Sequence, residues 1–380
     1  MRVCIVYDCL YPYTVGGAER WYRSLAERVA ARGHDVTYLT RRQWEVGDTP
    51  SLRDVHIVDV SSGGELYTRD GRRRVQPPLT FGAGVLRHLL RDRYRYDIVH
   101  TASFPYFSVL AAAAARRRGG FRLFVDWHEV WTRDYWHAYL GPAGGRAGWE
   151  IQRACLRVSH QAFCFSRMHE QRLRESGLSD VTRLDGQYAG GLELATAQRA
   201  ELVVVFAGRL IPEKNAAALL PAVVQARERV RELRLEIYGD GPERARILHS
   251  IDQGGLRTVV SAPGFVAQET LEHALARAMC LMLPSRREGY GLVVIEAAAK
   301  GIPSVVVRGP DNAAVELIED GVNGVVAPSA APHDLAAAIL RVHEGGVALR
   351  RSTADWFTQN ARRLSLESSL ERILDEYANA

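Results

Sequence analysis

The sequence predicts an α/β protein made of two tandem doubly wound domains of the Rossmann-like kind. Short runs of β-branched residues alternate with longer amphipathic segments, as in parallel sheets that are covered by helices on both faces. A glycine-rich segment over residues 186–191 interrupts this alternation, and a second series of runs begins at residue 202. The length of 380 residues suits two domains of ordinary size. We therefore expect a first domain over residues 1–190 and a second over residues 195–360.

In the first domain, short apolar runs predict strands, and segments with apolar residues every three or four positions predict helices. The predicted strands cover residues 2–7, 35–39, 55–60, 96–100, 122–126 and 162–165. The predicted helices cover residues 18–32, 81–93, 105–118, 146–158 and 167–176. Gly33 directly follows the first helix, in the position where a glycine commonly ends a helix.

The second domain repeats the same alternation. Its predicted strands cover residues 202–206, 235–238, 258–261, 280–283, 304–307 and 324–326. A last helix is predicted near residues 362–377, and we expect residues 362–380 to pack back on the first domain. Because doubly wound parallel sheets bind ligands at the carboxyl ends of their strands, the expected site is a cleft between the two domains.

Composition is that of an ordinary globular protein. Hydrophobic residues make up 47% and charged residues 24% of the chain, which excludes the disordered, collagen-like and disulfide-scaffold classes. No apolar run approaches the ~20 residues of a membrane span, and residues 1–7 indicate a strand rather than a signal peptide. The five cysteines are odd in number and lack metal-ligand spacing. They predict reduced packing residues in a cytoplasmic protein.

Positive charge is concentrated in the first half of the chain. Residues 1–190 hold 28 arginines against 20 acidic residues, whereas the whole chain has a net charge of +5. Basic clusters lie at residues 72–74, 91–95 and 116–118. They suit a solvated surface, an anionic acceptor, or peripheral contact with the anionic inner face of a membrane. Nucleic acid is not expected as a partner, because no helix-turn-helix, zinc-finger or RNA-platform signature accompanies the charge.

Two strand-end loops have residue types that suit an anion. Gly16 and Gly17 open the first predicted helix, where free backbone N–H groups favour a diphosphate; a plain tight turn is the alternative. In the second domain, Gly208 permits a turn, and Arg209 and Lys214 supply a guanidinium and an ammonium group for two phosphates. Only two of the 49 cationic residues are lysines, and one of them lies in this loop, which favours phosphate binding.

A third loop follows the predicted strand 280–283. Gly289, Tyr290 and Gly291 should expose backbone N–H groups at a helix start. Glu288 precedes that helix and Glu296 lies about two turns into it, so that one carboxylate can meet sugar hydroxyls and the other ribose hydroxyls. The alternative is a first-turn glutamate favoured by the helix dipole and an ordinary surface glutamate.

The fourth candidate is the segment from Asp126 to Trp149. His128 stands at the carboxyl end of a predicted strand, a place where a histidine is either functional or simply a hydrogen-bonded structural residue. Several aromatic residues follow, and their rings can stack on an acceptor or fill a core. They include Trp131, Tyr135 and Trp136.

Several chemistries lack their sequence signatures. No Asp-x-Asp occurs, so the element by which metal-dependent sugar transferases hold their metal is missing, and we expect no metal cofactor. No G-x-G-x-x-G, Walker A loop, G-x-S-x-G, H-E-x-x-H or Cys-x-x-Cys is present either. Dehydrogenase, P-loop kinase, serine-hydrolase and zinc-protease functions are therefore disfavoured.

Taken in order, these motifs resemble those of the retaining glycosyltransferases of family 4, which have the GT-B fold and belong to the superfamily of glycogen synthase and glycogen phosphorylase. The motifs are Gly16-Gly17-Ala18-Glu19, His128, Gly208-Arg209, Glu213-Lys214, Tyr238-Gly239-Asp240-Gly241-Pro242, Gly264-Phe265-Val266, and Glu288 with Glu296. The resemblance covers nearly the whole chain and is strongest from residue 206 to residue 328. The first half matches less closely, as expected of a domain that reads the acceptor.

The resemblance implies a sugar donor linked to a nucleoside diphosphate, either UDP or GDP, as co-substrate. It implies that Arg209 and Lys214 bind the diphosphate and that the backbone of residues 289–292 (Gly289, Tyr290, Gly291 and Leu292) lies against the phosphate and sugar. Glu288 would bind donor-sugar hydroxyls, Glu296 the ribose, and the backbone around Val266 the base. His128 would contact the far side of the sugar, and Gly16 and Gly17 would lie near the diphosphate or the acceptor. Trp131, Tyr135 and Trp136 are left as acceptor candidates.

The implied reaction transfers a sugar to a hydroxyl acceptor by front-face substitution with retention and without a metal. The departing phosphate oxygen takes the acceptor proton, and stabilisation of the leaving group is the largest contribution of the protein. Two alternatives are a sugar-nucleotide epimerase of the same fold and a non-catalytic nucleotide-sugar-binding protein. The junction 184–189 departs from the turn usual in this family, and the oligomeric state is not predicted.

Overall fold

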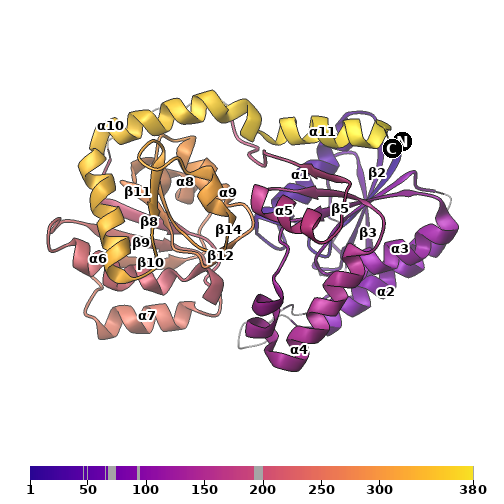
Figure 1. Cartoon of the computed structure of the whole chain (residues 1–380), viewed down its shortest axis with the longest axis horizontal. Coiled ribbons are helices and arrows are strands. Elements are labelled where there is room, and N and C mark those ends of the chain that lie inside the picture. The colour runs from indigo at the N-terminus through magenta and orange to yellow at the C-terminus, as the bar shows by residue number, and fades with distance from the viewer. Residues whose placement is uncertain are drawn as a thin grey trace. The chain divides into compact units, whose positions relative to one another are not determined.

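The computed structural model describes residues 1–45, 47–48, 50–64, 66, 74–91, 95–191 and 200–379. The chain divides into two compact units. The first contains the described residues up to Gly186 and those from Leu366 onward, and the second runs from Gln187 to Ser365. Figure 1 labels many of their helices and strands. Each unit is built on one parallel sheet, which confirms the predicted fold class.

The first unit has a sheet of seven strands that are all parallel. The strands are β1 (Arg2–Val6), β2 (Asp35–Arg41), β3 (Val55–Ser61), β4 (Ile98–Ala102), β5 (Arg122–Trp127), β6 (Gln161–Cys164) and β7 (Val181–Arg183), in the order β3-β2-β1-β4-β5-β6-β7. The order reverses between β1 and β4, which is the point where ligands of such sheets bind. The sequence analysis did not predict β7, which is only three residues long and lies at the edge of the sheet.

Among the described residues, six helices belong to the first unit. They are α1 (Gly17–Ala31), α2 (Gln76–Arg91), α3 (Phe107–Gly119), α4 (Arg133–Leu156), α5 (Arg167–Glu175) and α11 (Leu366–Asn379). Helix α4 begins well before the predicted start at residue 146, because Thr132 caps it and the glycines and Pro142 that obscure the pattern only kink it at Gly141. The last helix starts at Leu366 rather than Arg362, because the preceding helix continues to Leu364.

The second unit has a parallel sheet of six strands and a small two-stranded ladder. Its strands are β8 (Val203–Ala207), β9 (Arg234–Tyr238), β10 (Val260–Gly264), β11 (Cys280–Leu283), β13 (Ser304–Val307) and β15 (Gly324–Ala327), in the order β10-β9-β8-β11-β13-β15, and the ladder pairs β12 (Arg287–Glu288) with β14 (Asp311–Asn312). The helices are α6 (Leu219–Ala226), α7 (Arg244–Gln253), α8 (Gln268–Arg277), α9 (Leu292–Ala298) and α10 (Pro332–Leu364), with 3₁₀ turns at Pro212–Lys214, Ala216–Ala218 and Ala313–Leu317.

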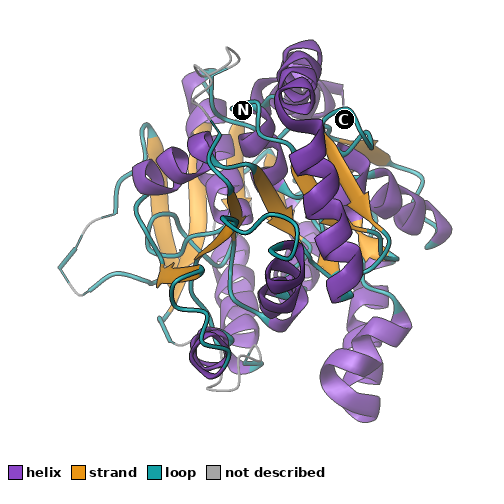
Figure 2. Ribbon diagram, turned by 90° about the vertical axis from the view of Figure 1, so that its left-hand side faces the viewer, coloured by secondary structure: helices purple, strands orange, loops and turns teal. Residues whose placement is uncertain are grey.

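Continuous apolar runs explain the central strands of both sheets. All five residues of β8, with the sequence VVVFA, are buried, as expected of a parallel strand that helices cover on both faces. In β4, all five residues are buried as well, although two of them are polar. Figure 2 shows the strands in orange with helices flanking them. Among the described helices, none combines the length and the apolar character that a membrane crossing needs.

A buried histidine makes the stability of the first unit sensitive to acid. His160 is 5% exposed, and its Nε2 accepts a hydrogen bond of 3.0 Å from the indole N–H of Trp127. Burial lowers the pKa of His160 to about 4, whereas an unfolded histidine titrates near ~6.5. At pH values between these two pKa values, His160 is protonated in the unfolded chain but not in the folded protein. The free energy of unfolding should therefore fall as the pH drops through this range, by about 3 kcal/mol in all. Urea unfolding across the range measures this loss, and His160→Gln should flatten it; equal pH dependence in both proteins would contradict the assignment.

Candidate active site

The loops that follow β8, β9 and β10 are joined by backbone hydrogen bonds at the carboxyl end of the second sheet. Gly208 N–H donates to the carbonyl of Tyr238 at 3.0 Å, and Gly239 N–H donates to the carbonyl of Gly264 at 2.9 Å. Leu210 N–H adds a bond of 2.8 Å to the carbonyl of Asp240. The three strand ends therefore form one continuous backbone surface beside Arg209.

This backbone surface requires a glycine at position 239, because a side chain does not fit there. Its φ is +133°, and a Cβ there would overlap the carbonyl oxygen of Gly208. We expect Gly239→Ala to lower the free energy of unfolding by about 3 kcal/mol, because backbone strain and overlap add. Gly255→Ala is the matched control, since Gly255 also has a positive φ of +62° but has open space around it. Equal losses in urea unfolding of the two variants would show that the overlap is relieved without cost.

Two further loops of the second unit are held against each other. The loop after β8 turns at Asn215, which has a left-handed backbone conformation and donates from its side chain to the carbonyl of Pro284 at 3.5 Å. Arg286 N–H donates to the carbonyl of Glu213 at 2.8 Å. These bonds bring the predicted phosphate-binding loop next to the loop that carries Glu288.

Lys214 and Glu288 form a direct ion pair across these two loops. Their side chains are only 16% and 10% exposed, respectively. Burial on this scale weakens the screening by water, so the two charges interact more strongly than an exposed pair would. The structure thus brings together two residues that lie 74 positions apart in the sequence and that the sequence analysis selected independently.

The buried amide of Asn312 holds the loop that presents Glu288. Strand β12 places Glu288 opposite Asn312 in β14. The amide nitrogen of Asn312 donates to the carbonyls of Ser285 at 3.0 Å and Val307 at 2.8 Å, and its oxygen accepts from Ala314 N–H at 3.1 Å. The sequence analysis missed this residue. The only signal for it was an asparagine in front of small residues, which is typical of a helix N-cap.

The other donor-side candidates lie in these two loops, just after β10, or within α9. Arg209 is exposed, Val266 is half-buried just after β10, and Tyr290 is buried. Gly291 has a φ of +99° and precedes α9, where a Cβ would come within 2.9 Å of the Cβ of Ala314. The remaining candidates are Gly289, half-buried in the loop, Leu292, the first residue of α9, and Glu296, half-buried within α9.

Glu296 lies close to a tyrosine of the segment that begins the second unit. The pKa of Tyr188 is raised, chiefly by burial and then by the negative charge of Glu296. The hydroxyl of Tyr188 therefore keeps its proton beside this carboxylate at neutral pH.

In the first unit, the paired glycines begin α1. Gly16 is the N-cap of this helix, and a Cβ on it would overlap the carboxylate of Glu19, which lies over the helix start. Gly17 has open space where its side chain would be. Anionic side chains are favoured at such a position, and the carboxylate of Glu19 lies beside Gly16 there.

His128 follows β5 and is held between two aromatic rings. It stacks on Phe165 with ring centroids 4.7 Å apart and planes 5° apart, and the ring of Tyr22 meets it edge-on at 5.8 Å. Burial lowers its pKa, an effect that the carboxylates of Asp126 and Glu129 partly offset. Its Nε2 is buried and makes no hydrogen bond to any described residue. His128 is thus a neutral imidazole whose buried Nε2 has no hydrogen-bond partner among the described residues.

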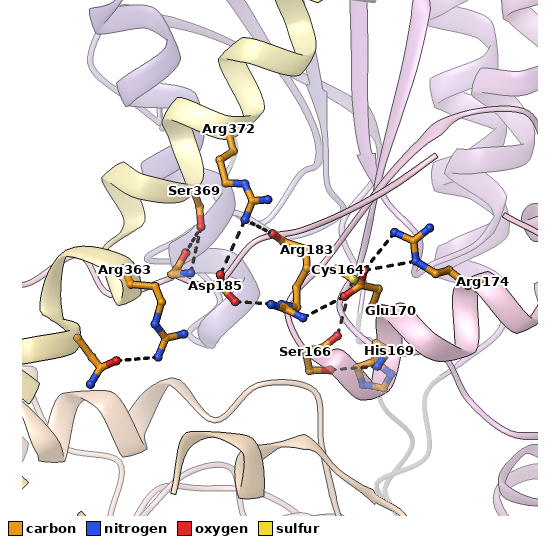
Figure 3. Close-up of polar contacts among 12 residues, drawn as sticks. Cys164, Ser166, His169, Glu170, Arg174, Arg183, Asp185, Arg363, Ser369 and Arg372 are labelled. Atoms are coloured by element: carbon orange, nitrogen blue, oxygen red, sulfur yellow. Dashed lines mark hydrogen bonds and ion pairs between the residues drawn. The ribbon is translucent and has the colours of Figure 1, made fainter. Parts of the chain in front are cut away.

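Helix α5 fixes the loop that follows His128. Ser166 caps this helix by accepting from His169 N–H at 3.2 Å, and the ring of His169 accepts from Val130 N–H at 3.2 Å. Glu170, on the same helix, forms ion pairs with Arg174 at 3.1 Å and with Arg183 at 3.0 Å (Figure 3). The loop is therefore hydrogen-bonded to α5, a helix whose surface side chains form ion pairs.

Of the three aromatic acceptor candidates, Trp131 contacts the other two. The ring of Trp131 lies 4.8 Å from that of Tyr135 and 4.6 Å from that of Trp136. Trp136 is 4% exposed and part of the hydrophobic core, where its indole donates to Gln152 at 3.0 Å. Trp131 and Tyr135 are half-buried. Packing therefore accounts for Trp136, and only Trp131 and Tyr135 offer accessible ring surface.

The basic clusters are described only in part. Arg74, Arg91 and Arg95 have positions in the structure, whereas residues 72–73 and 92–94 lie outside the described ranges. Residues 116–118 form the last turn of α3, and Arg117 and Arg118 are exposed there.

Both halves of the sequence match known protein families. Residues 16–184 match the family described as "Glycosyl transferase 4-like domain", and residues 196–363 match "Glycosyl transferases group 1". The glycogen synthase of Mycobacterium tuberculosis is 28% identical in an alignment that covers 92% of this chain and 88% of that protein. The alpha-D-kanosaminyltransferase of Streptomyces kanamyceticus is 28% identical in an alignment that covers 48% of this chain. The alignment spans about half (49%) of the length of that relative.

Solved structures show the same fold. Sucrose-phosphate synthase from Thermosynechococcus elongatus superposes with a TM-score of 0.83 and 19% identity, over 99% of this chain and 98% of that one. HepE from Anabaena, solved in complex with UDP and glucose, superposes with a TM-score of 0.75 and 15% identity, over the full length of both chains. At these identities the likeness concerns the fold alone.

Proposed function

We propose, from the premise that this chain belongs to the family-4 glycosyltransferases with the GT-B fold, that it moves a hexose from a nucleotide-diphospho-sugar to a hydroxyl acceptor with retention and without a metal. The observation that carries the proposal is the ion pair between Lys214 and Glu288, which brings together a cation suited to a phosphate and a carboxylate suited to sugar hydroxyls. The two family matches, one on each unit, support the same activity.

In this proposal the second unit binds the donor, and residues 195–360 make up the donor domain. Arg209 and Lys214 hold the diphosphate, and the backbone from Gly289 to Leu292 lies against the phosphate and sugar. Glu288 binds sugar hydroxyls. Glu296 binds the ribose, and the backbone at Val266 lies near the base.

The chemistry follows from these positions. The bond between the anomeric carbon and the phosphate oxygen breaks, and the acceptor oxygen bonds to the same face of that carbon. The acceptor proton passes to the departing phosphate oxygen. Lys214 and Arg209 neutralise the charge that develops on the nucleoside diphosphate, and the negative charge of Glu288 stabilises the oxocarbenium-like sugar.

The first unit, within residues 1–190 and 362–380, is proposed to bind the acceptor. The buried Nε2 of His128, which lacks a hydrogen-bond partner among the described residues, is proposed to meet a sugar hydroxyl when the donor binds, since a neutral imidazole can either donate or accept a hydrogen bond. Gly17 leaves space at the start of α1 for a close approach. Trp131 and Tyr135 are proposed to stack on the acceptor.

The donor is proposed to be linked to UDP or GDP. A relative from Mycolicibacterium smegmatis is named as a GDP-mannose-dependent mannosyltransferase, and HepE has been solved with UDP-glucose. Thermal unfolding of the purified protein with UDP, GDP and their hexose derivatives, in the presence of a chelator, tests the proposal directly. Binding raises the melting temperature by mass action. One donor should stabilise the protein and release its nucleotide on addition of an acceptor.

The same measurement separates the alternatives. An epimerase would convert the bound donor into an isomer without releasing the nucleotide. A binding protein would be stabilised and would turn over nothing with any acceptor. Absence of stabilisation by every nucleotide would overturn the donor site.

A peripheral contact with an anionic membrane face is proposed for the basic first unit. Arg117 and Arg118 are exposed at the end of α3, where three arginines follow one another. We expect the protein to sediment with phosphatidylglycerol vesicles at low salt and to be released as salt is added. Equal sedimentation with neutral phosphatidylcholine vesicles would contradict an electrostatic contact.

A further inference from the structure

A fully buried network of hydrogen-bonded polar side chains lies in the first unit near His128. His100, in β4, and Asp126, in β5, are both 0% exposed, and His100 Nε2 lies 2.7 Å from Asp126 Oδ1. On its other side, His100 Nδ1 lies 2.6 Å from the hydroxyl of Tyr377 in α11. The second oxygen of Asp126 accepts from the indole N–H of Trp21, in α1, at 2.8 Å. One sheet and two helices thus share a single network.

The protons in this network can be assigned. Burial alone would raise the pKa of Asp126, but the hydrogen bonds from His100 and Trp21 hold the pKa below its usual range. Asp126 is therefore ionised, and the nitrogen of His100 that faces it carries a hydrogen. Burial raises the pKa of Tyr377, so its hydroxyl keeps its proton and donates to Nδ1. Every polar atom in the line has a partner, which is what makes such a network rigid.

Aromatic contacts connect the network to His128. The ring of Trp21 meets Phe165 edge-on at 5.0 Å, and Phe165 is the ring on which His128 stacks. The ring of Tyr22 lies edge-on to both histidines, 6.4 Å from His100 and 5.8 Å from His128. Of the two rings that hold His128, Tyr22 lies in α1 and Phe165 packs against Trp21 of α1, and Trp21 is hydrogen-bonded to Asp126.

We propose that Asp126, His100 and Tyr377 are positioning residues for His128, so that the last helix of the chain contributes to the active site without touching a substrate. The inference rests on the proposed function only because that function assigns His128 a substrate to bind. Removing the hydroxyl of Tyr377 leaves Nδ1 of His100 buried without its donor. His100 and Asp126 must then rearrange, and the displacement reaches His128 through Trp21 and Phe165.

Tyr377→Phe tests this with little disturbance, because the ring that packs 4.8 Å from Phe124 stays in place. Tyr96→Phe is the matched control. It removes another buried tyrosine hydroxyl of the same unit, one that bonds to His88 at 2.8 Å. The imidazole resonance of His128, assigned through His128→Gln, should move in Tyr377→Phe and stay in place in Tyr96→Phe. An unmoved resonance in Tyr377→Phe would overturn the proposal without reference to any substrate.

Kinetics give a second, independent readout with the donor identified in the nucleotide-sugar screen. Tyr377→Phe should lower kcat about tenfold and leave the KM for the donor unchanged. In a His128→Ala background, the same substitution should have almost no further effect. A tenfold loss that persists in that background would refute the positioning role. If His128→Ala alone had no effect on transfer, the proposed function of His128 would fail instead.

Trp21→Phe provides another route if Tyr377→Phe does not fold. It removes the bond to Asp126 and retains an aromatic ring against Phe165. It should move the same His128 resonance and lose its kinetic effect in the same background. An unmoved resonance would count against the proposal as in Tyr377→Phe.

Discussion

Replacing Lys214 with alanine is expected to lower turnover at least about a hundredfold while the protein stays folded. Loss of one group that stabilises a developing anion typically has an effect of this size. In this protein the change also leaves the carboxylate of Glu288, which is only 10% exposed, without its partner. Steady-state release of the nucleotide from the donor, together with urea unfolding of the same sample, separates the catalytic loss from the smaller loss of stability.

The chain provides a control of the same chemical type. Lys300 is its only other lysine, and the ammonium nitrogen of Lys300 lies 3.9 Å from a carboxylate oxygen of Glu272. Lys300→Ala therefore removes an equal charge and an equal side chain away from the two joined loops. It should leave turnover within about twofold of the unchanged protein. Near-native turnover of folded Lys214→Ala would refute the assignment of this lysine to the diphosphate.

Glu288→Gln is expected to reduce sugar transfer about a hundredfold and to change the affinity for the bare nucleoside diphosphate by no more than about threefold. The amide keeps the size of the side chain but cannot stabilise positive charge on the sugar in the transition state. The nucleotide affinity is preserved because Lys214, freed from its ion pair, can still bind the diphosphate. Single-turnover transfer and calorimetric titration with UDP or GDP give the two quantities.

Glu296→Gln should show the opposite pattern. This glutamate lies within α9, near Tyr188, and is proposed to bind the ribose. Its substitution should weaken nucleotide binding and reduce transfer only in proportion. If Glu288→Gln abolished binding of the nucleoside diphosphate, the roles of the two glutamates would have to be exchanged.

Periodicity predicted the two sheets because parallel strands are buried on both faces and therefore appear as unbroken apolar runs. Strands β11 and β13 begin and end at the predicted residues. Strand β7 was missed because three residues at a sheet edge carry no such run. Helix α4 was predicted too short because its glycines and Pro142 resemble a loop, although the structure accommodates them as a kink.

For the candidate site, the sequence could indicate residue types and strand-end positions but not partners. Lys214 and Glu288 were chosen for their chemistry, and their direct contact depends on how two loops of one sheet meet. The residues that hold the site residues in place could not be predicted from the sequence for the same reason. Asn312 acts through carbonyls on two other segments, and Tyr377 bonds to a histidine 277 positions earlier. Nothing in a local pattern encodes contacts of this range.

The return of α11 to the first unit also has a consequence for the order of folding during synthesis. The seven strands of that unit all precede residue 184, whereas Tyr377 follows the whole second unit in the chain. Domains commonly fold as they emerge, N-terminal parts first. In this chain the first sheet emerges complete, but His100 has no hydroxyl to bond until the entire second unit has been translated. The nascent first unit therefore cannot close its core until α11 has emerged.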